Sequence, residues 1–163
     1  MNDIASILVI GTGATAIADL WGLARRPLLG VAPPDYRMVG RWFGHMLDGR
    51  FRHEAIAGAP AVRGERFMGW AIHYGTGILF ATLLVGITGT AWLREPTLAP
   101  ALAIGIGTVL APFLLMQPGM GAGIAARRMP RPNGSRVQSL LLHAAFGLGL
   151  YATARAIQML QIS

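Results

Sequence analysis

The chain has 163 residues, of which 53% are hydrophobic, 13% are charged and none is cysteine. Soluble domains carry about 25% charged residues, so this composition argues against a soluble domain. The apolar content excludes intrinsic disorder, and the lack of cysteine excludes a disulfide scaffold. These values predict a small membrane protein with several spans, built as one domain over residues 1–163.

Four stretches of the chain are long and apolar enough to cross a bilayer. A transmembrane helix needs about 20 mostly apolar residues to span a hydrocarbon core of about 30 Å. The stretches cover residues 4–23, 67–93, 98–126 and 137–160, and Asp19 is the only acid inside them. The sequence therefore predicts an all-α integral membrane protein that folds as a bundle of four transmembrane helices.

The basic residues, all of them arginine, are unevenly distributed among the loops. Of the 14, eight lie in the first loop (residues 24–66), four lie between the third and fourth spans, and one lies between the second and third. By the positive-inside rule the two arginine-rich loops face the cytoplasm, which puts both termini outside. The N-terminus has no basic region typical of a signal peptide, so we expect the first span to be retained. Because the arginines flank apolar spans, the expected partner is the lipid bilayer and not nucleic acid.

The first loop is long enough to contain a helix. Two prolines followed by Asp35 indicate a helix start with Asp35 as the N-cap, and Gly49 is a plausible end. One polar stripe of this helix consists of Arg37, Arg41, His45 and Asp48. The pattern predicts an amphipathic helix in the cytoplasmic membrane interface, with arginines toward anionic head groups and Trp42 at the boundary. The alternative is an ordinary polar loop.

Glycines recur in pairs within the predicted spans. Residues 7–16 match the strand and glycine turn of a dinucleotide-binding fold, with Gly11 and Gly13 in the turn. That fold also needs a second buried strand that ends in an acid, whereas the candidate acid, Asp35, follows two prolines. We therefore interpret the glycines as small residues that let membrane helices approach closely. The same interpretation fits Gly75, Gly77, Gly105, Gly107, Gly147 and Gly149.

One side chain suited to binding falls at a similar depth in each span. Counted from the nearest cytoplasmic arginine, Asp19 lies six residues inside, and His73, Met120 and His143 each lie seven. At 1.5 Å per residue these positions are about 9–11 Å inside the boundary, and Gln117 lies about one turn deeper. The sequence therefore predicts a ligand-binding polar layer of Asp19, His73, His143, Gln117 and Met120.

Two interpretations of this polar layer are open. A carboxylate in hydrocarbon is costly and usually faces a partner or a functional site. An imidazole that donates Nδ1–H to Asp19 would keep Nε2 for a proton, a ligand or a metal. As metal candidates, His73, His143 and Met120 would suit copper, and two histidines could hold haem. Alternatively, Asp19 pairs with Arg25 or Arg26 just after its own span, and the histidines only form hydrogen bonds between helices.

The sequence contains no recognisable catalytic set. It has no cysteine or lysine nucleophile, no Gly-x-Ser-x-Gly elbow and no His-Glu-x-x-His motif, and it identifies no cofactor. The first functional hypothesis is therefore the binding or passage of a small ligand, metal ion or proton at the polar layer, near the cytoplasmic side. The second is a structural or accessory subunit of a larger membrane complex, or a homo-oligomer. The third is a membrane-embedded enzyme that acts on a lipid or quinone, with a histidine as acid or base.

Five short motifs are distributed along nearly the whole chain. They are Gly-Ala-Thr at 13–15 with Asp-Leu-Trp at 19–21, Gly-Arg-Trp-Phe-Gly-His at 40–45, Gly-Trp-Ala-Ile-His-Tyr at 69–74, Met-Gln-Pro-Gly-Met-Gly at 116–121 and Phe-Gly-Leu-Gly-Leu-Tyr at 146–151. In this order they resemble an uncharacterised family of small bacterial membrane proteins, classed as a domain of unknown function. The resemblance implies a four-span protein of the bacterial inner membrane, and it brings no activity, substrate, cofactor or site residue.

Overall fold

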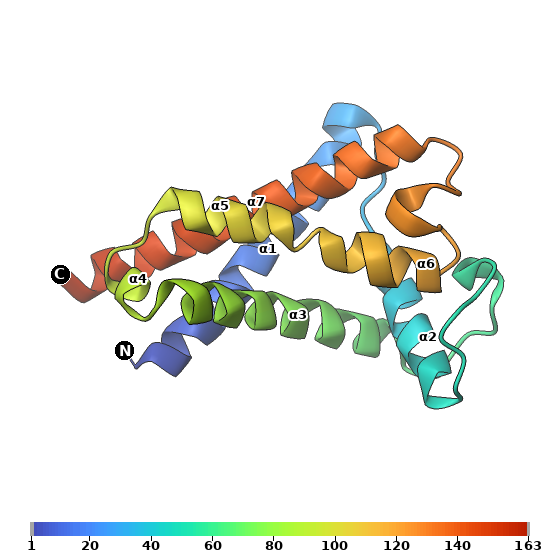
Figure 1. Cartoon of the computed structure of the whole chain (residues 1–163), viewed down its shortest axis with the longest axis horizontal. Helices are drawn as coiled ribbons and strands as arrows, with labels where there is room; N and C mark the ends of the chain where they lie inside the picture. Colours follow the sequence, from blue (N-terminus) through green and yellow to red (C-terminus); the bar gives the residue numbers. More distant parts are fainter. Residues whose placement is uncertain (1, 163) are drawn as a thin grey trace. The chain divides into compact units, whose positions relative to one another are not determined.

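The computed structural model describes residues 2–162, and within this range it contains helices and connecting loops but no strand (Figure 1). Four helical segments are long and apolar enough to cross a membrane. They are α1 (Asp3–Leu29), α3 (Glu65–Thr88), the segment Leu98–Gly119 and α7 (Pro132–Ile162). The predicted all-helical class, with four helices of membrane-spanning length, is confirmed.

The first two long helices end at glycines with a left-handed backbone. The side chain of Asn2 caps the start of α1 by accepting a hydrogen bond from the backbone N–H of Ala5 at 2.8 Å. The helix continues past its predicted end at residue 23 and stops before Gly30, where φ is +67°. The second span was predicted to reach residue 93, but α3 stops at Thr88 because Gly89 has φ +80°. The separate short helix α4 (Ala91–Arg94) follows.

The third span differs most from its predicted bounds. It consists of α5 (Leu98–Gly107), a π-helical turn (Pro112–Met116) and the short α6 (Gln117–Gly119). The predicted end of this span, at Ala126, is wrong. Gly121 and Gly123 have φ of +98° and +74°, a conformation that ends a helix and that glycine adopts without steric cost. A short 3₁₀ turn, Ile124–Ala126, then leads toward α7.

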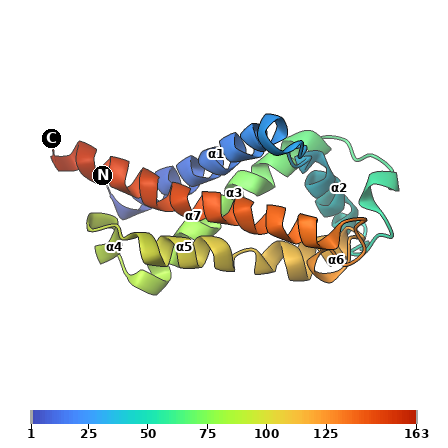
Figure 2. The same ribbon diagram turned by 90° about the horizontal axis from the view of Figure 1, so that it is seen from above.

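The chain forms two compact units, which we describe separately. The first unit contains α1, Tyr74–Thr108 and α7 from Leu141 onward. Its hydrophobic core contains residues from all of these helices, and Ile10, Leu84 and Leu150 are its largest fully buried apolar side chains. α5 and α7 lie side by side in both views (Figures 1 and 2). The first unit is therefore a helical bundle with a continuous apolar core.

Glycines bring helix backbones of the first unit into direct contact. A Cβ atom built on Gly105 of α5 would lie 2.4 Å from the Cα of Gly147 on α7, and one built on Gly11 of α1 would lie 2.6 Å from the Cα of Ile78 on α3. Contacts this short leave no room for a side chain. By contrast, a Cβ built on Gly107 would meet nothing within 4 Å.

The second unit contains Pro34–His73 and Val109–Leu140. Its main helix is α2 (Tyr36–Leu47), and Ile56–Gly58 form a 3₁₀ turn in the loop that follows. The N–H of His53 donates to the carbonyl oxygen of Gly119 at 2.9 Å, and the N–H of Ile56 donates to that of Met120 at 3.0 Å. The loop after α2 is thus tied by backbone hydrogen bonds to the end of the third span.

Candidate functional site

Asp19 and Tyr74 form a carboxylate–hydroxyl pair inside the first unit. Asp19 is half-buried on α1, directly after the buried Ala18, and its Oδ2 atom is buried. The side chain of Tyr74, on α3, makes a hydrogen bond to the Asp19 side chain. A phenol O–H is the donor that an ionised carboxylate accepts, so Tyr74 supplies a polar partner for the one acid of the predicted spans.

His143 joins α7 to the end of α5 in the first unit. Its Nδ1 atom lies 3.0 Å from the Oγ1 of Thr108 and 3.2 Å from the carbonyl oxygen of Gly105. The Thr108 hydroxyl donates to the Gly105 carbonyl oxygen at 2.6 Å, so its oxygen accepts the Nδ1–H of a neutral His143. This network assigns the proton to Nδ1 and the ring lone pair to Nε2.

His73 lies in the second unit, in a cluster of aromatic rings. It stacks on Tyr36 with ring centroids 3.8 Å apart and an angle of 21° between the ring planes. Trp70, one turn earlier on α3, meets the same Tyr36 ring edge-on with centroids 4.9 Å apart. His73 therefore contributes to the packing between the starts of α2 and α3.

Gln117 and Met120 also belong to the second unit. The Oε1 atom of Gln117 is buried and has no hydrogen-bond partner within residues 2–162. Met120 lies just after α6, and its backbone carbonyl accepts the hydrogen bond from Ile56. The predicted depth of Met120 is wrong, because residues 120–128 form turns and counting 1.5 Å per residue from Arg127 applies only along a continuous helix.

The structure thus distributes the predicted layer over its two units. Asp19 and His143 belong to the first unit, and His73, Gln117 and Met120 to the second. The count along a continuous helix remains valid for Asp19, His73 and His143, which lie within α1, α3 and α7. Within residues 2–162, no three His, Cys, Asp or Glu side chains gather as a metal site would require.

The helix expected at the membrane interface is present, but its Arg41 contacts the protein. Asp35 caps α2 as predicted, accepting the N–H of Arg37 at 3.1 Å. The Nε and Nη2 atoms of Arg41 each donate to a Glu65 carboxylate oxygen at 2.8 Å, and the two side chains are only 12% and 13% exposed. The expectation that Arg41 points to lipid head groups is therefore wrong. Its hydrogen bonds to Glu65 hold the pKa of Arg41 above its ordinary value.

Two further residues of the predicted interfacial set, Trp42 and His45, are also buried, in this case inside the second unit, to which they belong. The Nε1–H of Trp42 donates to the carbonyl oxygen of Phe51 at 3.0 Å, and its ring covers Gly119. The Nε2 atom of His45 lies 2.9 Å from the carbonyl oxygen of Pro60. Both contacts hold the loop after α2. Trp42 thus packs inside the second unit, and its level relative to a bilayer stays a prediction.

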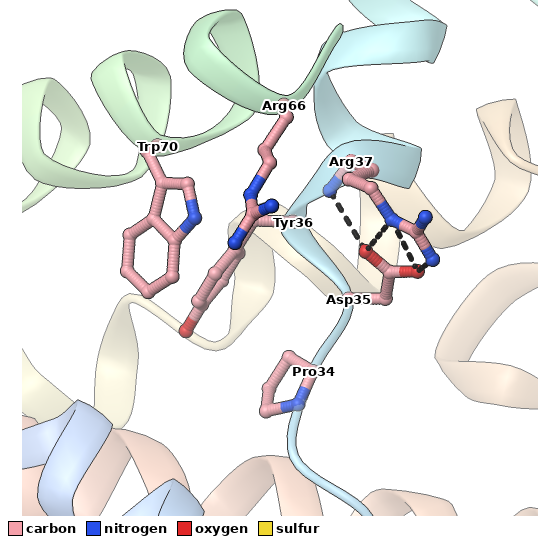
Figure 3. A pocket seen from close by; sticks show the side chains of 6 residues that line it. All are labelled: Pro34, Asp35, Tyr36, Arg37, Arg66 and Trp70. Carbon is pink, nitrogen blue, oxygen red and sulfur yellow. Dashed lines mark hydrogen bonds and ion pairs between the residues drawn. The ribbon is translucent and has the colours of Figure 1, made fainter. Parts of the chain in front are cut away.

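Arg37, the remaining member of that set, is exposed and lines an open pocket of about 310 Å³ together with Pro34, Asp35, Tyr36, Arg66 and Trp70 (Figure 3). Arg37 forms an ion pair with Asp35, with Nη2 and Oδ2 2.7 Å apart. The side-chain hydrogen bonds that Arg37 donates to Asp35 lower the pKa of Asp35 and raise the pKa of Arg37. Both groups therefore stay charged at neutral pH.

The sequence analysis missed several of these residues. Tyr74 follows His73 directly, and a tyrosine within a membrane span needs a partner for its hydroxyl. Arg66 and Trp70 are four residues apart at the start of a span, which puts them on one face of the helix. Both signals are visible in the sequence. Thr108 offered no comparable signal, because a threonine in a helix often bonds to its own backbone.

Four helices are long and apolar enough to cross a membrane, and one of them carries a carboxylate within its apolar stretch. These features suggest a helical membrane protein with several spans. The chain belongs to the family described as "Protein of unknown function (DUF2938)", which matches residues 8–157. Membership of an uncharacterised family, predicted from the sequence motifs, is confirmed. No curated protein and no solved structure matches the chain.

Proposed function

We propose that the protein binds a small ligand within its membrane-spanning part, and that this ligand is a proton carried by the Asp19 carboxylate. The observation that carries the proposal is the hydrogen bond between Asp19 and Tyr74 in the first unit. A carboxyl group held in an apolar helical bundle is energetically costly, and proteins retain such groups mainly on proton or ion pathways or in ligand sites. Asp19 is the group that gains and loses the proton, and Tyr74 orients it.

His143 supports this assignment from the same unit. Its Nδ1–H is directed to Thr108, which places the basic lone pair on Nε2. An imidazole in this tautomer accepts a proton without rearranging its existing hydrogen bond. A proton also needs no cluster of ligands, whereas a bound metal ion is held by three or four protein groups. The Asp19–Tyr74 pair and the His143 tautomer therefore support a proton as the ligand.

His73, Gln117 and Met120, the other residues of the predicted layer, lie in the second unit and enter the proposal as candidate ligand-binding residues. The buried Oε1 atom of Gln117, without a hydrogen-bond partner among the described residues, supports a polar role for this side chain. We place the layer on the cytoplasmic side of a bacterial inner membrane, with both termini outside, because the arginine-rich loops lie near these residues in sequence.

Passage of the proton is tested in proteoliposomes that contain a pH-sensitive dye. When a membrane potential is imposed, we expect vesicles with the wild-type protein to acidify on the order of tenfold faster than vesicles with Asp19→Asn, because the amide cannot carry the proton. The matched control is Asp48→Asn, which removes an exposed carboxylate after α2. Equal rates for the wild-type protein and Asp19→Asn would contradict passage through this residue.

An exposed glycine face on α3 supports a second candidate function, docking to another membrane helix. Gly75 and Gly86 are exposed, and a Cβ built on either meets nothing within 4 Å. Small residues at such positions let a second helix approach closely in lipid. Single cysteines at these two positions should cross-link copies of this cysteine-free chain, whereas one at the exposed Leu23 of α1 should not. Equal cross-linking at all three positions would argue against a specific face.

A further inference from the structure

The pocket at the start of α2 contains more positive than negative charge. Its lining includes Arg37, Arg66 and Asp35, which gives a net charge of +1. Asp35 is already paired with Arg37, and Arg66 makes no ion pair within residues 2–162. Arg66 is therefore the cation whose charge is not balanced by a protein carboxylate.

The close contact of α2 with α3 explains why these two arginines share one pocket. A Cβ built on Gly40 would lie 1.9 Å from the carbonyl oxygen of Glu65, and one built on Gly69 would lie 1.9 Å from that of Tyr36. The backbones of the two helices touch at both points, so neither helix start can move without breaking the other contact. This packing holds Arg37 near Arg66 although 29 positions separate them in the sequence.

Aromatic rings form the remaining wall of the pocket. Tyr36 is held between Trp70, with centroids 4.9 Å apart, and His73, with centroids 3.8 Å apart. Figure 3 shows the Arg66 side chain extending from α3 toward the Tyr36 ring, with Trp70 on the same helix. The lining thus combines a fixed aromatic surface with a guanidinium that is available to an anion.

We propose that this pocket binds a phosphate group, carried by the head group of an anionic phospholipid or present as free phosphate. A guanidinium recognises phosphate oxygens through two parallel N–H donors, and Arg66 supplies this fork. The net charge of +1 matches one phosphodiester. Trp70 supports a lipid source, because indole rings favour the level of the head groups at the end of a membrane span. This site is independent of the Asp19–Tyr74 pair.

Binding is measured by native mass spectrometry of the full chain in detergent, with phosphatidylglycerol, phosphatidylcholine and inorganic phosphate as probes. We expect the wild-type protein to retain phosphatidylglycerol in preference to phosphatidylcholine. We expect Arg66→Gln to weaken this binding about tenfold, the effect of losing one charge-assisted contact. Arg66 is exposed, so the variant should fold.

Two matched controls separate the pocket from the general charge of the protein. Arg63→Gln removes an exposed arginine three positions before Arg66 that does not line the pocket, and it should leave binding unchanged. Asp35→Asn releases Arg37 and should strengthen binding severalfold, whereas Asp48→Asn, with the same change in net charge, should not.

The outcomes distinguish the source of the phosphate. Arg66-dependent binding of phosphatidylglycerol assigns the pocket to a lipid head group, and Arg66-dependent binding of inorganic phosphate alone assigns it to the free anion. Either result supports the phosphate site. If Arg66→Gln and Arg63→Gln bind every probe equally, the proposal is overturned.

Discussion

Replacing Arg41 by alanine is expected to lower the free energy of unfolding by about 3 kcal/mol, the effect of removing one partner of a buried ion pair. The substitution leaves the Glu65 carboxylate, which is 13% exposed, without its two guanidinium donors. The N–H of Val62 would remain as a donor to this carboxylate. Arg41 also bonds the carbonyl oxygens of Ala57 and Ala59, so its loss should loosen the loop after α2. Denaturation by sodium dodecyl sulfate in mixed micelles measures the change.

The matched control is Arg37→Ala, which breaks the ion pair with Asp35 on the same helix. The side chains of that pair are 56% and 42% exposed, and exposed pairs contribute little because water screens them. We therefore expect the free energy of unfolding to stay nearly unchanged. Similar losses for Arg37→Ala and Arg41→Ala would show that the Arg41–Glu65 pair has no special structural role.

Gly105→Ala is expected to destabilise the first unit by about 1–3 kcal/mol, the usual effect of forcing a methyl group into a packed contact. The new Cβ would lie 2.4 Å from the Cα of Gly147 and 3.0 Å from the carbonyl oxygen of His143. The helices α5 and α7 must then separate, which also disturbs the hydrogen bonds of the His143 ring with Thr108 and Gly105. Thermal unfolding of the purified protein measures the loss.

Gly107→Ala provides the control for this prediction within the same helix. A Cβ at Gly107 meets nothing within 4 Å, and alanine is a better helix former than glycine by about 0.5–1 kcal/mol. We expect this variant to be as stable as the wild-type protein or slightly more stable. If both substitutions destabilise the protein equally, the close contact of Gly105 with Gly147 is not what limits stability.

The class of fold could be predicted from composition because long uncharged stretches have few alternatives to a membrane helix. The helix ends were harder to predict. The end of the third span depends on the positive φ values of Gly121 and Gly123, and the loop after α2 packs on Gly121. A Cβ at Gly121 would lie 2.0 Å from the carbonyl oxygen of Glu54, a contact that connects distant parts of the sequence. Counting apolar residues cannot detect such a contact.

The candidate site, like the fold, could be predicted only in part. Asp19 was recognisable because a single carboxylate in an apolar stretch is exceptional. Its partner Tyr74 was not selected. The sequence shows that a tyrosine hydroxyl in a span needs a partner, but not that Asp19 is this partner until α1 and α3 are placed together. The role of Arg41 was misjudged for a similar reason. Its position on a polar stripe suggested lipid head groups, while the acid that binds it lies 24 residues away in sequence.

The most direct test of the proposed function is the ionisation of Asp19 itself, measured by carbon-13 NMR of protein labelled at the aspartate carboxyl carbons in lipid nanodiscs. The chain has four aspartates, and Asp19→Asn identifies the Asp19 signal. We predict that this signal changes when the carboxyl group gains or loses its proton, and that Tyr74→Phe alters the signal without affecting that of the exposed Asp48. An Asp19 signal that stays constant wherever the protein is folded, or that ignores Tyr74→Phe, would contradict proton binding at this pair.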